Sequence, residues 1–99
     1  MQFAYTEELR RYMEETGKRS IVVEVAQSDG DFEVTELHIH FTSEKQAELF
    51  QKRQGFHRFG TELGEVLLPN YRLQYAETIT FGLKKRLFWK TLTQTGISF

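Results

Sequence analysis

The sequence predicts a small α+β domain in which a small antiparallel or mixed sheet carries two helices. Its 99 residues suit a single domain, which we expect to span residues 1–99. Apolar residues make up 39% of the chain and aromatic residues 14%, which is enough to build a core without cross-links. Two amphipathic segments alternate with runs rich in β-branched and aromatic residues. The expected order of elements is β-α-β-β-α-β-β-β.

Residues 1–5 predict a short strand, and residues 7–16 predict the first helix. Thr6 is a suitable N-cap, and acidic residues follow it in the first turn, where the helix dipole favours them. Gly17 provides the stop signal. The apolar positions that recur at helical spacing are Leu9, Tyr12 and Met13.

Residues 20–27 and residues 32–41 predict a β-hairpin, because both runs are β-rich and Asp29-Gly30 between them is a strong turn signal. With Asp29 and Gly30 as the two loop residues, the numbers of paired residues sum to 59. The expected cross-strand pairs are Val25 with Val34, Val23 with Glu36, Ile21 with His38, Val22 with Leu37 and Glu24 with Thr35. Neither face is cleanly polar, so we expect partial cover on both sides.

The second helix begins after Ser43, which stands in capping-box spacing with Gln46, and it ends at Gly55. Residues 56–64 are expected to be irregular. Residues 65–68 form a short apolar run and predict a strand that ends at a Pro-Asn turn.

Residues 71–83 alternate apolar and polar side chains, which indicates a strand with a break near Ala76-Glu77. Residues 87–93 can be drawn as a short amphipathic helix or as a strand. The aromatic residues and threonines of this segment favour the strand.

The composition limits the chemistry. The chain has no cysteine, which excludes disulfides, thiolate catalysis and cysteine-ligated zinc or iron–sulfur clusters within one chain. No apolar run reaches the roughly 20 residues needed to span a bilayer, and residues 1–8 lack the features of a signal peptide. We therefore expect a cytoplasmic protein without a membrane partner.

Charge is distributed unevenly along the chain, although the net charge is only −1. Residues 1–50 hold eleven acids and five bases, whereas residues 51–99 hold three acids and eight bases. The favoured explanation is that the two halves mix in the fold and neutralise each other locally. The alternative is a dipolar surface that binds an unidentified protein or a second copy of the chain.

The segment from Glu36 to Phe41 alternates strictly, so in a strand Glu36, His38 and His40 share one face. Two imidazoles and a carboxylate can hold a divalent metal, and His57 could add a ligand. The favoured explanation is two ordinary strand histidines in a semi-buried position beside Ile21. A divalent metal site is the alternative.

Gly55 and Gly60 bracket a second candidate site. Glycines let a backbone approach a ligand closely, and His57 with Arg58 could bind a phosphate or a carboxylate. The favoured explanation is a helix end followed by two phenylalanines that anchor the core, with His57 and Arg58 in solvent.

The third candidate is a basic-aromatic patch, in which cations alternate with aromatic rings as in single-strand nucleic-acid binding. Its residues are Lys84, Lys85, Arg86, Trp89 and Lys90, together with Phe88. The isoelectric point of about 6.3 argues against nucleic acid, and Phe88 and Trp89 are more simply core residues of the last strand. A helical segment would admit a role at a membrane surface, which four charges alone support weakly.

The beginning of the chain resembles the HesB/IscA-like iron–sulfur biogenesis superfamily. The resemblance rests on three segments: the strand and helix start Phe3-Ala4-Tyr5-Thr6-Glu7-Glu8-Leu9, the hydrophobic strand at 21–25, and the closing Gly96-Ile97-Ser98-Phe99. The resemblance implies a compact α+β domain of folded antiparallel sheets in a bacterial cytoplasm. It transfers no functional residue, because that family binds iron or a nascent cluster through cysteines and this chain has none.

Together these features predict a non-enzymatic binding or accessory protein of unknown ligand, with no cofactor expected. No phosphate-binding loop, nucleophile elbow or Ser/His/Asp set is present in the sequence. Divalent metal binding at the histidines is the first alternative, and nucleic-acid binding at the basic-aromatic patch is the second.

Overall fold

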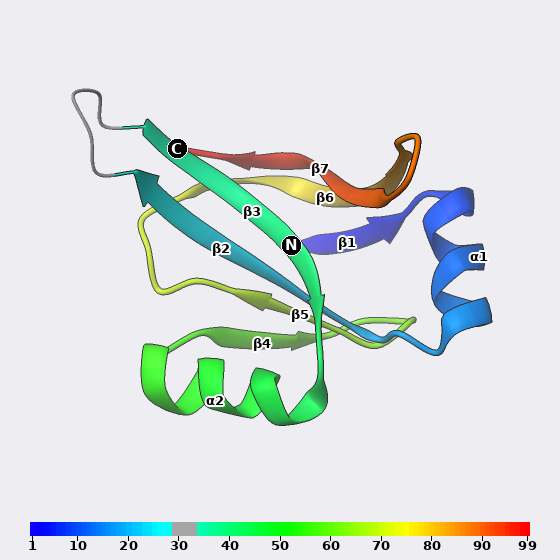
Figure 1. Ribbon diagram of the computed structural model, residues 1–99. Helices are drawn as coiled ribbons and strands as arrows, with labels where there is room; N and C mark the ends of the chain where they lie inside the picture. Colours follow the sequence, from blue (N-terminus) through cyan, green and yellow to red (C-terminus); the bar gives the residue numbers. More distant parts are fainter. Residues whose placement is uncertain (29–33) are drawn as a thin grey trace.

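The structure, a computed structural model, describes residues 1–28 and 34–99 and has the predicted α+β class (Figure 1). Its elements are β1 (Gln2–Tyr5), α1 (Glu7–Thr16), β2 (Ser20–Ser28), β3 (Val34–Thr42), α2 (Glu44–Gln54), β4 (His57–Gly60), β5 (Glu65–Leu68), β6 (Gln74–Lys85) and β7 (Lys90–Ser98). In the described residues the strands form two mixed sheets rather than the single sheet expected. One sheet has the order β1-β6-β7 and the other has the order β3-β2-β5-β4. Alternation along a strand shows which face is buried but not which strands pair, so the sequence could not separate the two sheets.

The main core is built from both sheets and from α1. From α1 it takes Leu9 and Met13, whose spacing of four places them on one helix face. The buried residues that the strands contribute are Tyr5, Ile21, Val23, Val66, Leu68, Ile79, Phe81, Leu83, Leu92 and Ile97. Because each sheet contains strands from both halves of the chain, the acidic and basic halves mix in space, and the ion pair between Arg10 and Glu62 joins them directly.

A smaller cluster lies between α2 and the four-stranded sheet. Ala47 of α2 packs with Val22 of β2 and Leu67 of β5, and Phe56 and Phe50 complete the cluster. Val22 lies between Ile21 and Val23, which belong to the main core, so this cluster occupies the opposite face of the sheet. Figure 1 shows α2 along this side, and the prediction of partial cover on both sides of the hairpin is confirmed at β2.

The capping residues in the sequence predicted the start and the end of both helices correctly. The Thr6 side chain accepts a hydrogen bond from the Leu9 amide, and the Ser43 side chain accepts one from the Gln46 amide. Gly17 and Gly55 end α1 and α2 with φ of 74° and 70°, a left-handed conformation that glycine adopts without a steric penalty.

The predicted register of the β2–β3 hairpin is wrong. Val23 pairs with Ile39 and Glu24 pairs with His38, which shifts the partners by three residues. An odd shift turns every side chain to the opposite face. The predicted register would have placed His38 beside the core residue Ile21, whereas the observed register places Phe41 beside Ile21 and Ile39 beside Val23. The Asp29-Gly30 turn itself lies outside the described residues.

The second half of the chain contains one strand that the sequence did not predict. Residues 57–60 form β4, which pairs antiparallel with β5, so the expectation of an irregular segment over 56–64 is wrong there. The predicted break in β6 is confirmed, because the register with β7 shifts between Tyr75 and Thr80. The last strand begins at Lys90 and not at residue 87.

Tyr5 joins β1 to the loop that follows β4 through its phenol, which lies 2.6 Å from the Thr61 hydroxyl. Burial raises the pKa of Tyr5 above its ordinary value, and the hydrogen bond to Thr61 offsets part of this shift. Burial also raises the pKa of Tyr75. Because the folded state favours the neutral phenols, their contribution to stability is complete below about pH 10 and is lost as pH rises through the folded pKa values.

We therefore expect Tyr5→Phe to have two effects. Near neutral pH it removes the hydrogen bond and lowers the free energy of unfolding by about 1 kcal/mol. Above about pH 10 the variant should lose less stability than the wild type does, because one titrating group is gone. Urea unfolding at both pH values measures this, with the exposed Tyr71→Phe as control. If wild type and Tyr5→Phe lost the same free energy of unfolding at alkaline pH, the raised pKa of Tyr5 would be contradicted.

Candidate functional site

The histidine row lies on the face of the four-stranded sheet that α2 covers only in part. Every second residue of this part of β3 points to this face, and the three residues there, Glu36, His38 and His40, are exposed. Their cross-strand partners on β2 are Ala26, Glu24 and Val22. The row is therefore exposed and not semi-buried beside Ile21, because the register places Ile21 on the other face.

Each histidine of the row has a carboxylate neighbour. His40 Nε2 contacts a Glu24 carboxylate oxygen, and His38 Nε2 lies 3.3 Å from a Glu36 carboxylate oxygen. His40 Nδ1 also lies 3.2 Å from the Phe41 carbonyl oxygen, so both of its ring nitrogens are engaged. Among residues 1–28 and 34–99, no group of three or more His, Cys, Asp or Glu side chains is arranged to hold a metal. Metal binding at this row stays the alternative hypothesis, which titration can test.

We expect no heat when zinc is titrated into untagged protein at about pH 7.5, where imidazoles are free to ligate. His38→Gln and His40→Gln should each change the free energy of unfolding by no more than about 0.5 kcal/mol, since both side chains are exposed. The control is His57→Gln, and a second titration at about pH 5.5 tests proton competition. Heat that disappears at the lower pH and in the His38/His40 double variant would establish a metal site instead.

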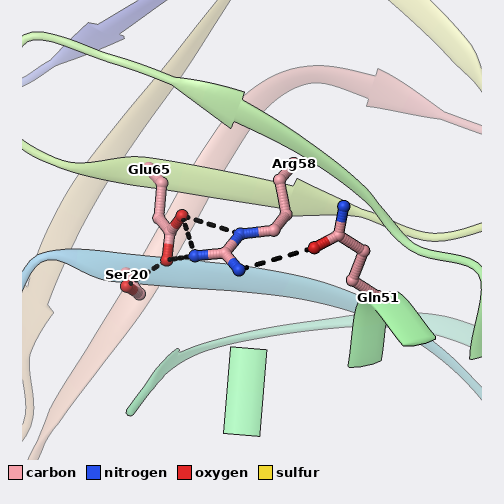
Figure 2. Close-up of polar contacts among 4 residues, drawn as sticks. All are labelled: Ser20, Gln51, Arg58 and Glu65. Atoms are coloured by element: carbon pink, nitrogen blue, oxygen red, sulfur yellow. Dashed lines mark hydrogen bonds and ion pairs between the residues drawn. The ribbon is translucent and has the colours of Figure 1, made fainter. Parts of the chain in front are cut away.

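The second candidate site contains a polar network that joins three strands and α2 (Figure 2). The Arg58 guanidinium on β4 donates from Nε and from one terminal nitrogen to the Glu65 carboxylate on β5, at 2.6–2.9 Å. Ser20 on β2 donates to the same carboxylate at 2.8 Å. The other terminal nitrogen of Arg58 lies 3.5 Å from the Gln51 side-chain oxygen on α2.

The structure does not bring His57 and Arg58 together. They are successive residues of β4, so their side chains point to opposite faces, and His57 is exposed. The Arg58 charge is already neutralised by Glu65. An anion would have to compete with this carboxylate for Nε and for one terminal nitrogen of Arg58.

An open cleft of about 660 Å³ lies beside the network. Lys18, Ser20 and Arg58 are among its lining residues, together with Glu44 at the start of α2. No buried side-chain nitrogen or oxygen in the described residues lacks a hydrogen-bond partner. The cleft therefore offers no unsatisfied buried group that would direct a ligand into it.

The third candidate site differs most from expectation. Residues 86–89 form the loop between β6 and β7, closed by a hydrogen bond of 2.7 Å from the Arg86 amide to the Trp89 carbonyl oxygen. Leu87, Phe88 and Trp89 are 92%, 90% and 61% exposed. The interpretation of Phe88 and Trp89 as core residues is wrong, because the chain turns at this point instead of continuing as a strand.

We call residues 84–90 the β6–β7 tip. Its basic residues are Lys84, Lys85, Arg86 and Lys90, all exposed. Figure 1 shows this turn projecting at the end of the molecule where α1 lies, and Lys90 Nζ stands 4.4 Å from the Tyr12 ring centre on α1. The sequence identified the basic residues and Trp89 but not Leu87. Four basic residues that bracket three apolar ones indicate a turn, since a buried strand excludes charge.

No known protein family, curated protein or solved structure matches this chain. The three candidate sites can be compared only by their own geometry. The histidines and the Arg58 network have partners within the molecule, whereas the apolar side chains of the β6–β7 tip lie in solvent.

Proposed function

We propose that the protein is a non-enzymatic binding or accessory protein that contacts its partner through the β6–β7 tip. The observation that carries this proposal is the exposure of Leu87, Phe88 and Trp89 next to one another. Single exposed apolar residues are ordinary, but three large ones in sequence on a projecting turn leave apolar area in water that a partner would cover. Tryptophan and phenylalanine are also frequent anchors of interfaces.

Retention by the fractions of a cell extract tests this function. Purified protein is applied to immobilised soluble proteins, to immobilised RNA and to vesicles made from extracted lipids. Wild type should be retained by one fraction at least about tenfold more strongly than Leu87→Ser/Phe88→Ser, because burial of these side chains drives the contact. The control Phe99→Ser removes an exposed aromatic residue outside the tip and should bind as wild type does. Equal retention of all three proteins would refute the proposal.

The same surface has a competing use as a nucleic-acid interface, with cations that meet phosphates and rings that stack on bases. Only four bases gather at the tip and the chain is acidic overall, so we expect negligible binding at physiological salt. Divalent metal binding at Glu36, His38 and His40 is the other alternative function.

The relationship to the HesB/IscA-like superfamily and the cytoplasmic location remain part of the proposal. The strand–Thr6–helix start and the glycine in the last strand support the relationship. The absence of cysteine means that cluster transfer does not come with it. No helix in the described residues is long and apolar enough to cross a membrane.

A further inference from the structure

We infer that the β6–β7 tip docks on an anionic phospholipid surface, where Leu87, Phe88 and Trp89 enter the headgroup region. This inference names the partner class of the proposed binding function and rests on it. It concerns attachment to one leaflet, which requires no membrane-spanning segment, and it departs from the sequence-based expectation of no membrane partner.

The apolar part of the tip suits shallow insertion. The most exposed of the three side chains belongs to Leu87, an aliphatic residue, and the aromatic residues Phe88 and Trp89 follow it. The hydrogen bond between Arg86 and Trp89 satisfies one backbone donor and one acceptor of the loop, which lowers the cost of removing them from water. Tryptophan is also enriched at the boundary between water and lipid.

The charged part of the tip supplies a second, independent observation. Lys85 and Lys90 are direct cross-strand partners, and like charges placed opposite each other destabilise a hairpin. Within the described residues, none of the four bases of the tip forms an ion pair with a carboxylate. An anionic surface would relieve this repulsion.

The rest of the molecule orients the tip. Residues 84–90 hold four bases and no acid, so the remaining chain carries a net charge of −5 against −1 for the whole. A negative surface therefore attracts the tip and repels the remaining body, which turns the molecule so that Leu87 to Trp89 meet the bilayer first.

A bilayer fits these features better than a nucleic acid or a protein groove does. Leu87 cannot stack on a base, yet it is the most exposed of the three apolar residues of the tip. A protein groove would need a shape matched to a narrow turn, whereas a headgroup region accepts apolar side chains of any shape. Lipid phosphates also supply negative charge around the whole turn, where the bases lie on both strands.

Trp89 is the only tryptophan of the chain, so its fluorescence reports on the tip without a label. The protein is titrated with vesicles of phosphatidylcholine alone and with vesicles that contain about one third phosphatidylglycerol. We expect a blue shift of Trp89 emission and quenching by lipids brominated near the headgroup, only with the anionic vesicles. Higher salt should weaken the effect, because screening shortens the reach of the charges.

Four variants separate the two parts of the tip from general effects. Leu87→Ser/Phe88→Ser should lower partitioning about tenfold or more while Trp89 remains as reporter. Lys84→Gln/Lys85→Gln should lower it about fivefold per base. Lys45→Gln/Arg53→Gln removes the same charge from α2, which lies on the outer side of the other sheet (Figure 1), and should retain binding within about threefold. Phe99→Ser controls for an exposed aromatic residue elsewhere.

Other results would overturn the inference. A blue shift that rises with protein concentration without lipid would assign the tip to a second copy of the chain, and a shift with short single-stranded DNA would assign it to nucleic acid. Retention by the soluble-protein fraction without any response to vesicles would refute the lipid assignment and leave the proposed binding function intact. Equal partitioning of wild type and Leu87→Ser/Phe88→Ser would refute the role of the tip altogether.

Discussion

Gly64→Ala is expected to lower the free energy of unfolding by about 3 kcal/mol, the upper end of the cost of overpacking. A Cβ atom at Gly64 would stand 2.0 Å from the Arg19 carbonyl oxygen and 2.8 Å from its carbonyl carbon. These are backbone atoms, and the same carbonyl accepts the 2.9 Å hydrogen bond from the Glu65 amide at the start of the parallel β2–β5 pair. The clash can be relieved only by separating these two strands.

Urea unfolding measures this loss. Gly60→Ala is the matched control, because a Cβ atom there meets nothing within 4 Å. The control should stay within about 0.5 kcal/mol of wild type. If the two variants were equally stable, the close approach of Gly64 to Arg19 would be wrong.

Glu65→Ala is expected to cost about 2 kcal/mol. Removing one partner of a fully buried ion pair costs more, but the Arg58 and Glu65 side chains here keep 26% and 20% of their exposure, so water screens part of the loss. The variant leaves the Arg58 guanidinium and the Ser20 hydroxyl without their acceptor. The penalty is thus the desolvation of groups that have lost a partner.

A double variant separates this penalty from the value of the pair itself. Arg58→Met/Glu65→Met removes both charges and should recover much of the loss, because apolar side chains of similar length can replace a partly buried pair. Glu48→Ala breaks the exposed pair with Lys52 and should change stability by no more than about 0.5 kcal/mol. A double variant less stable than Glu65→Ala would show that the ion pair is itself strongly stabilising.

The parts of the fold that depend on neighbouring residues could be predicted from the sequence. Thr6 and Gly17 mark the two ends of α1, and the sequence predicted both because capping interactions are local. The register of β2 against β3 depended instead on the whole core, in which Ile39 lies beside Val23. β4 was missed because two of its four residues are His57 and Arg58, whose polar side chains give an edge strand no apolar alternation.

In the candidate sites, too, features set by neighbouring residues could be predicted and features set by distant residues could not. Alternation alone correctly placed His38 and His40 on one face, but the carboxylate of Glu24 beside them required the true register. The bond from Arg58 to Glu65 spans seven residues and depends on the pairing of β4 with β5. The exposure of Trp89 was missed because aromatic residues are usually buried, and the turn at this point lacks the glycine, proline or asparagine that marks most turns. The basic residues on both sides of it were the signal that could have revealed the turn.

The pairing of β1 with β6 has a consequence for how the chain folds. Gln2 lies beside Thr78, 76 positions later, so β1 has no pairing partner until β6 exists. Closing such a distance costs chain entropy before any contact compensates it, and distant pairings slow folding. Phe3 and Tyr5 therefore lack their contacts with the Phe81 ring on the nascent chain until β6 has emerged. During synthesis, the three-stranded sheet can therefore form only after β6 has been made.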